Sequence, residues 1–318
     1  MEFTDVLRAG RAIAAHLPPT PMWNYPELDR ATGATVYVKH EHVQPIGAFK
    51  VRGGITLLAG MPPDDRARGV VTWSTGNHAQ SIAYACRLFD APCVVVMPED
   101  PNPTKLSAVA ALGAEVVCRG AELEGAQRAA ERLAAERGMR LVSPGDEPAL
   151  VAGVATLYAE MLTARPDLDT ILVPVGGGSG AAGACLVAAA LAPRCRIVGV
   201  QSTASPAAHD SWRAGTLVTR PNRTTAEGLA TGAGFALTQS VLRAYLHDFV
   251  LVPDDAIRAA QGRLLTAAHT LAESAGAAPL AALLADPPRY AGRTVGIVVT
   301  GGNASPAELS AVLATTGH

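Results

Sequence analysis

The fold is decided by the stretch Thr170-Ile171-Leu172-Val173-Pro174-Val175-Gly176-Gly177-Gly178-Ser179-Gly180-Ala181. Its first half is a continuous apolar run, which is typical of a strand buried on both faces. Glycines then open an Ala-rich pattern over 179–191 that predicts a helix. Four glycines in five positions let backbone amides converge on an anion at the start of that helix, where the helix dipole favours negative charge. The stretch therefore predicts a strand, a turn and a helix around a phosphate-sized group.

The same rhythm of strand, glycine turn and helix recurs along the 318 residues. Apolar runs predict strands at Thr35–Val38, Gly69–Trp73, Cys93–Met97, Glu115–Cys118, Thr170–Val175, Arg196–Val200, Phe249–Val252 and Thr294–Val299. Helical patterns cover Asn77–Phe89, Pro103–Leu112, Leu123–Arg137, Ser179–Leu191 and Asp255–Thr270. Strands alternating with helices at this spacing predict an α/β fold with two open parallel-sheet lobes and helices on both faces.

The Pro/Gly/acid-rich segment 142–148 has the composition of a hinge. We therefore expect a large domain formed by residues 1–42 and 146–318, and a small mobile domain formed by residues 43–145.

Composition excludes several classes of protein. The net charge is −2 and no basic stripe is present, so nucleic acid is not an expected partner. The longest apolar stretch, 181–192, is too short to span a bilayer, and the N-terminus lacks a signal core, so we expect no membrane association and a cytoplasmic location. The five cysteines form no C-x-x-C pair and fit buried positions in a reducing compartment.

Three further segments carry groups suited to chemistry. Gly47-Ala48-Phe49-Lys50 places a lysine in the first turns of a helix, where desolvation lowers the pKa of an amine and frees it for a Schiff base; an ordinary surface lysine is the alternative. Ser74-Thr75-Gly76-Asn77-His78 offers hydroxyls and helix N-terminal amides to a carboxylate, although a plain capped turn would look the same. Thr300-Gly301-Gly302-Asn303 follows another strand and by itself indicates only a capped turn.

The order of these motifs, Gly-Ala-Phe-Lys, Ser-Thr-Gly-Asn-His, Gly-Gly-Gly-Ser-Gly and Thr-Gly-Gly-Asn, resembles the serine/threonine dehydratase family. That family belongs to the fold type II pyridoxal-phosphate enzymes, the tryptophan synthase β superfamily. The resemblance spans nearly the whole chain. It implies pyridoxal 5'-phosphate as the cofactor, held in the cleft between two lobes.

The resemblance also implies residue roles. Lys50 carries the cofactor and moves the Cα proton, and Thr75 stands where racemising relatives use a serine as a second acid/base. The cofactor-binding residues implied are Phe49, Lys50, Asn77, Gly176, Gly177, Gly178, Ser179, Gly180, Gly228, Glu273 and Thr300. The substrate-binding residues implied are Ser74, Thr75, Gly76, Asn77 and His78.

The activity implied is elimination of water from a β-hydroxy amino acid such as threonine or serine, which gives a 2-oxo acid and ammonia. An amino-acid racemase and a β-replacement synthase on the same fold are the alternatives, and a non-catalytic ligand-binding relative is a third. The chain departs from the family at Thr75, at Gly153-Val154-Ala155-Thr156, and at Gln201, where an acidic residue is common. Because Gln201 is neutral, we expect no divalent metal. A homodimer or higher homo-oligomer is expected, with no regulatory domain after the last motif.

Overall fold

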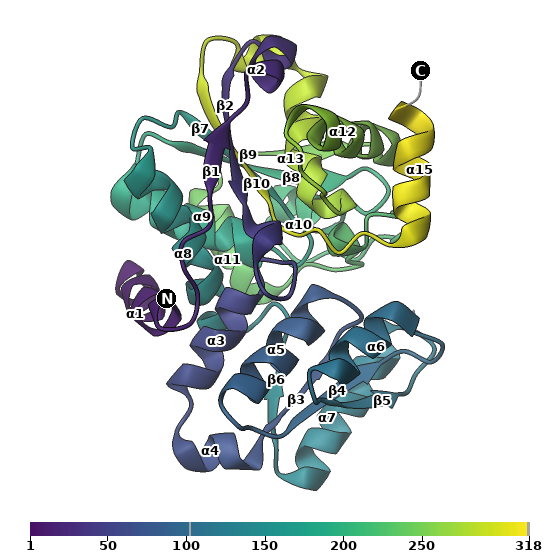
Figure 1. Ribbon diagram of the computed structural model, residues 1–318. Helices are drawn as coiled ribbons and strands as arrows, with labels where there is room; N and C mark the ends of the chain where they lie inside the picture. Colours follow the sequence, from purple (N-terminus) through teal and green to yellow (C-terminus); the bar gives the residue numbers. More distant parts are fainter. Residues whose placement is uncertain (102, 317–318) are drawn as a thin grey trace. The chain divides into compact units, whose positions relative to one another are not determined.

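A computed structural model describes residues 1–101 and 103–316 of the chain (Figure 1). Contacts divide the chain into two compact units. The smaller unit consists of Phe3–Leu17 and Lys50–Val154. The larger unit consists of Pro18–Phe49 and the chain from Ala155 onward. Each unit is built around a sheet of its own.

The smaller unit contains a four-stranded parallel sheet in the order β5-β4-β3-β6. Its strands are β3 (Val70–Trp73), β4 (Cys93–Met97), β5 (Glu115–Cys118) and β6 (Arg140–Val142). Its helices are α1 (Phe3–Ala14), α3 (Val51–Gly60), α4 (Pro63–Arg68), α5 (Asn77–Leu88), α6 (Pro103–Ala111) and α7 (Leu123–Arg137).

Helices cover both faces of this sheet. Neighbouring residues of a strand point to opposite faces, and accordingly Val70 and Val95 share a core with side chains of α3, α5 and α6. Val71 and Val94 share a second core with the alanine-rich face of α7. Because both faces are dry, β3 and β4 are apolar at nearly every position, which is the pattern that predicted them.

The larger unit contains a six-stranded sheet in the order β1-β2-β10-β7-β8-β9, parallel except for β1. Its strands are β1 (Met22–Asn24), β2 (Thr35–His40), β7 (Thr170–Pro174), β8 (Arg196–Ser202), β9 (Asp248–Val252) and β10 (Thr294–Val299). Its helices include α2 (Pro26–Thr32), α9 (Ser179–Leu191), α10 (Ala207–Ala214), α11 (Ala236–Tyr245), α12 (Asp254–Ala267), α13 (Ser274–Ala285), α14 (Pro287–Tyr290) and α15 (Pro306–Thr316). Short 3-10 turns occupy Glu41–Val43 (η1) and Glu227–Leu229 (η2).

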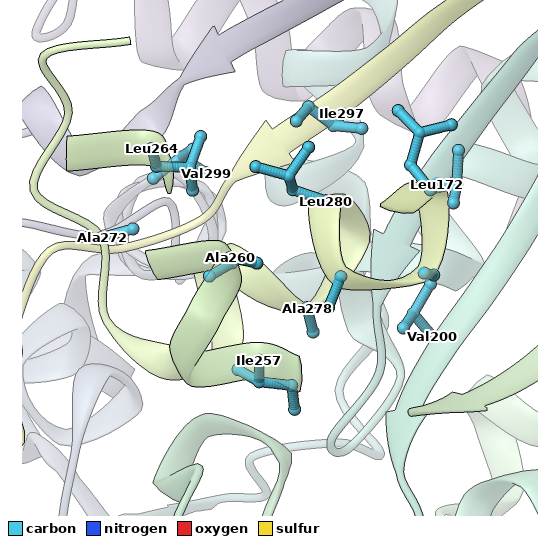
Figure 2. Packing of buried hydrophobic residues seen from close by; sticks show 14 of the residues in the cluster. Leu172, Val200, Ile257, Ala260, Leu264, Ala272, Ala278, Leu280, Ile297 and Val299 are labelled. Carbon is cyan, nitrogen blue, oxygen red and sulfur yellow. The ribbon is translucent and has the colours of Figure 1, made fainter. Parts of the chain in front are cut away.

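One face of the larger sheet packs on α12 and α13 through buried aliphatic side chains, among them Leu172, Ile297 and Leu280 (Figure 2). The opposite face packs on α8 (Pro148–Ala164), whose Met161 Cε lies 2.8 Å from the position that a Cβ on Gly296 would occupy. Helices α8 and α9 approach closely, because a Cβ on Gly183 would lie 2.9 Å from Cα of Ala155. The glycine at 183 therefore permits this helix contact.

The structure confirms the α/β fold, and the strand ends predicted at Cys93–Met97, Glu115–Cys118 and Thr294–Val299 are those observed. Strands β1 and β6 escaped prediction, since each has three residues and most of them are exposed or half-buried. The observed division differs from the expected one at three places. Helix α1 and residues 146–154 belong to the smaller unit, and residues 43–49 belong to the larger unit. Among the described residues, no helix has the length and apolar character needed to cross a bilayer.

Candidate active site

Lys50 is the N-cap residue of α3, one position before the helical turns in which the sequence placed it. Its carbonyl accepts a hydrogen bond from the Ser81 hydroxyl of α5, and the Gly54 N–H donates to the same Ser81 oxygen at 3.2 Å. A Cβ on Gly54 would lie 2.4 Å from the Ser81 carbonyl oxygen, so only glycine allows this approach of α3 to α5. The Lys50 carbonyl is therefore tied to α5 through Ser81.

The environment of Lys50 favours the neutral amine. Surrounding protein atoms desolvate the ammonium group and lower the pKa of Lys50 to about 8. A lysine with this pKa provides a substantial fraction of free amine near neutrality, which is the form that attacks a carbonyl carbon.

The loop at 74–78 follows β3 and opens α5. Gly76 is the N-cap of α5 and, as a glycine, has no side chain with which to cap the helix. The Ser74 hydroxyl accepts from the Gly76 N–H at 3.2 Å and shapes the turn. Amides in the first turn of a helix have no acceptor within it, so they suit a carboxylate. Thr75, Asn77 and His78 lie on this segment, as the sequence indicated.

His78 is a neutral donor that holds the loop. The Thr72 hydroxyl donates its single proton to the Val142 carbonyl at 2.8 Å, so its oxygen must accept from Nε2–H of His78, 2.8 Å away. Burial first, and the nearby Lys50 charge second, lower the pKa of His78 to about 3. His78 therefore fixes the start of α5 and does not act as a base.

The glycine loop is closely surrounded in the larger unit. Gly178 is the N-cap of α9 with φ of 89°, in the left-handed region that favours glycine. A Cβ on Gly176 would lie 2.3 Å from the Gly228 carbonyl oxygen, and a Cβ on Gly177 would lie 3.1 Å from the Phe235 ring. As a glycine, Gly178 has no side chain with which to cap α9, and the first amides of a helix have no acceptor within it, so they suit an anion.

Two threonines set the orientation of the peptides in this loop. The Thr231 hydroxyl donates to the Gly176 carbonyl at 3.3 Å, and the Thr238 hydroxyl donates to the Gly177 carbonyl at 2.8 Å. In a trans peptide the C=O and the following N–H point in opposite directions. The threonines therefore turn the N–H groups of Gly177 and Gly178 away from themselves. No sequence motif indicated either threonine, because both lie more than fifty residues from the loop.

The remaining predicted residues of the larger unit gather beside the glycine loop. The Phe49 N–H donates to the Thr300 carbonyl at 2.8 Å. A Cβ on Gly180 would lie 3.3 Å from Cε2 of Phe49, and one on Gly228 would lie 3.9 Å from Oε1 of Glu273. Thr300, at the end of β10, is buried. Packing thus brings together residues that span 49 to 300 in the sequence.

Comparison with known proteins identifies the family. A family model described as pyridoxal-phosphate dependent enzyme matches residues 13–301. The chain belongs to this family. L-threonine ammonia-lyase of Geobacter sulfurreducens is 36% identical over 98% of this chain and 78% of its own length. L-threo-3-hydroxyaspartate ammonia-lyase of Saccharomyces cerevisiae is 33% identical over 95% of this chain and 93% of its own. The structure of maize serine racemase matches with a TM-score of 0.92 and 30% identity, over 99% and 98% of the two chains.

The residues of this pyridoxal-phosphate-dependent enzyme fit its cofactor. The walls of the glycine loop leave no room for side chains, since Cβ atoms on Gly176 and Gly178 would meet Gly228 and Thr238 at 2.3 and 3.0 Å, so the loop presents its backbone alone. Lys50, an amine of lowered pKa, is the residue that would bond to the aldehyde carbon. The glycine loop would hold the phosphate through its backbone amides.

Within the described part of the chain, no group of three or more His, Cys, Asp or Glu side chains is placed to hold a metal ion. Asp210 accepts from Arg220 Nε at 2.6 Å and pairs with His209 Nδ1 at 2.9 Å. Gln201 accepts from the His209 N–H at 3.0 Å. The Asp210 carboxylate is thus engaged by cationic and donor groups of the protein.

Proposed function

We propose that this enzyme is an ammonia-lyase that eliminates water from a β-hydroxy amino acid such as threonine or serine, giving a 2-oxo acid and ammonia. The observation that carries the proposal is Lys50, a desolvated amine with a pKa of about 8 in the same unit as a loop of helix N-terminal amides. The relatives from Geobacter sulfurreducens and Saccharomyces cerevisiae, both named as ammonia-lyases, support the reaction class.

Each protein group has a task in this proposal. The cofactor supplies the electron sink for the bond broken at Cα. Lys50, as the free amine, accepts the Cα proton. The amides at the start of α5 and the Ser74 hydroxyl hold the substrate carboxylate. Thr300 offers a hydroxyl where an acid would keep the pyridine nitrogen protonated, which favours prompt elimination over a long-lived carbanion.

Racemisation is the second candidate, favoured by the similarity to maize serine racemase. It requires a second acid/base on the face of Cα opposite Lys50, and Thr75 is the residue at that position in the motif. The threonine methyl group stiffens χ1 and limits how the hydroxyl can be aimed. We therefore propose that elimination exceeds racemisation.

A product analysis tests these proposals together. The purified enzyme is incubated with L-threonine, L-serine or L-threo-3-hydroxyaspartate, and 2-oxo acid and D-amino acid are measured over time. We expect 2-oxo acid to dominate with at least one substrate, and EDTA to leave the rate unchanged. Lys50→Ala should abolish turnover and the visible cofactor band while the far-UV circular dichroism persists. D-serine appearing faster than pyruvate would overturn the elimination proposal, and magnesium-reversible inhibition by EDTA would overturn metal independence.

We also propose that the enzyme works as a homodimer or higher homo-oligomer in the cytoplasm. Large apolar side chains such as Trp23 and Val43 are more than half exposed in the larger unit, and such side chains are commonly covered on association. Light scattering coupled to size-exclusion chromatography measures the mass; a single species at 32.6 kDa would contradict the oligomer.

A further inference from the structure

Tyr158 of α8 is a buried polar residue that none of the motifs above includes. Its side chain is 0% exposed, and among the described residues its hydroxyl has no hydrogen-bond partner. Burial raises the pKa of Tyr158 well above its usual value, so the hydroxyl keeps its proton and can donate it. Native proteins leave few buried polar atoms unsatisfied, and such an atom points to a role with a ligand or an ordered water.

The packing of α8 against α9 determines where this hydroxyl lies. The helices touch at Ala155 and Gly183. Tyr158 is three residues after Ala155, and Gly180 is three residues before Gly183. Both residues therefore lie about one helical turn from the Ala155–Gly183 contact, in the direction of the start of α9. The Tyr158 hydroxyl oxygen is 3.3 Å from the position that a Cβ on Gly180 would occupy. Because Gly180 has no side chain, the hydroxyl packs directly against the backbone of the first turn of α9.

Among the described residues, no neighbouring protein group accepts a hydrogen bond from the Tyr158 hydroxyl. Glu41 and Cys185 are the charged or titratable groups that act on Tyr158. Oxygens of Glu41 already accept from the Thr20 hydroxyl at 2.6 Å and the Gln44 amide at 3.3 Å. The Phe49 ring, 3.3 Å from the same Cβ position on Gly180, is apolar.

We propose that Tyr158 is a further cofactor-binding residue, whose hydroxyl donates a hydrogen bond, directly or through one water, to the cofactor phosphate at the first turn of α9. The phosphate ester has only acceptor oxygens, and the loop 176–180 contains no cationic side chain. A neutral phenol adds a donor there without adding a buried charge. It also supplements the amides of a helix N-terminus, which attract the same anion.

Tyr158→Phe tests the proposal, because it removes the hydroxyl and keeps the ring. Apoenzyme is titrated with pyridoxal phosphate and, separately, with pyridoxal, which lacks the phosphate. We expect the dissociation constant for pyridoxal phosphate to rise about tenfold, the effect of losing one hydrogen bond to a charged group, and that for pyridoxal to stay unchanged. Tyr290→Phe is the matched control: Tyr290 is a buried tyrosine of α14 in the same unit, and its variant should bind both compounds as the wild type does.

A second measurement separates ligand binding from packing. Urea unfolding is compared for the apo and loaded forms of the wild type and of Tyr158→Phe. We expect the variant to stabilise the apoenzyme, because an unsatisfied buried hydroxyl is removed, and to reduce the stabilisation gained from the cofactor. Equal shifts in both forms, or equal losses of affinity for pyridoxal and pyridoxal phosphate, would assign Tyr158 to packing alone and overturn the proposal.

Discussion

Burial of Lys50 changes the protonation of its amine and the pH dependence of stability. Lys50 has an ordinary pKa of 10.5 in water, and burial lowers it to about 8. Between these values the folded apoenzyme binds fewer protons than the unfolded chain. The contribution of Lys50 to the free energy of unfolding therefore rises with pH across this window. Below pH 8 the destabilisation caused by burying the charged ammonium group is fully present. The same shift in the pKa of Lys50 makes the free amine available at a pH of about 8.

We predict that the apoenzyme captures pyridoxal phosphate faster as pH rises from about 6.5, with half of the maximal rate near the Lys50 pKa of about 8. The physical reason is that only the neutral amine attacks the aldehyde carbon. Stopped-flow absorbance measures the rate at each pH. His78, with a pKa of about 3, should contribute no inflection between pH 5 and 9. A capture rate independent of pH would contradict the assignment of Lys50.

Single elements are held by contacts between segments that are distant in sequence. The turn before α9 contacts η2 so closely that a Cβ on Gly176 would lie 2.3 Å from a backbone oxygen of Gly228. A backbone atom cannot rotate away as the end of a side chain can. The most restricted glycine of the loop 176–180 is thus Gly176, and its restriction comes from outside the loop.

We predict that Gly176→Ala weakens cofactor binding at least tenfold, because the loop or η2 must move, a change of roughly 1.4 kcal/mol or more. Equilibrium titration of the apoenzyme with pyridoxal phosphate measures the effect. Gly60→Ala is the matched control. A Cβ on Gly60 meets no atom within 4 Å, so this variant should keep the affinity and gain up to about 1 kcal/mol of helix stability. Equal affinities for the two variants would count against the close fit of the loop.

Helix α13 begins next to Glu273 and is capped by a side chain from α15. Glu308 Oε1 accepts from the Ser274 N–H and from Gln261 Nε2, both at 2.7 Å. The carboxylate therefore satisfies a free amide of the first turn of α13 and complements its dipole. This contact holds the segment that carries Glu273.

We predict that Glu308→Gln lowers the free energy of unfolding by about 1–2 kcal/mol, because an amide group replaces a carboxylate that accepts several hydrogen bonds. Urea denaturation measures the change. Glu131→Gln is the control, since Glu131 is exposed and accepts a hydrogen bond from the Gln127 amide of the same helix at 3.0 Å. A Glu308→Gln variant as stable as this control would show that the cap is dispensable.

The residues that we propose for cofactor binding are divided between the two units: Lys50 belongs to the smaller unit, and the loop 176–180 and Thr300 belong to the larger. We predict that 4'-deoxypyridoxine phosphate, which cannot bond to a lysine, slows amide exchange chiefly in the first turn of α9. Pyridoxal phosphate should in addition slow exchange around the start of α3. Hydrogen exchange with mass spectrometry measures both. Identical protection by the two compounds at the start of α3 would contradict the role of Lys50.

The sequence alone determined the features that arise within short windows. A buried strand, a glycine turn and a helix start are contiguous, so the α/β class and most strand ends were predicted and confirmed. The glycine turn before α9 lies where it was predicted, and its role in binding phosphate stays a prediction. The lysine motif was likewise local, although its helix begins one residue later than expected. The short strands β1 and β6 were missed because three exposed or half-buried residues carry too weak a pattern.

Properties that depend on burial and on distant partners could not be read from the sequence. Several such properties depend on packing between separate segments. They are the lowered pKa of Lys50, the tautomer of His78, the threonine hydrogen bonds to Gly176 and Gly177, the cap from Glu308 and, among the described residues, the unpartnered hydroxyl of Tyr158. The physical reason is that desolvation and hydrogen bonding act over a few ångströms in space. Residues that lie a few ångströms apart in space can be hundreds of positions apart in the chain.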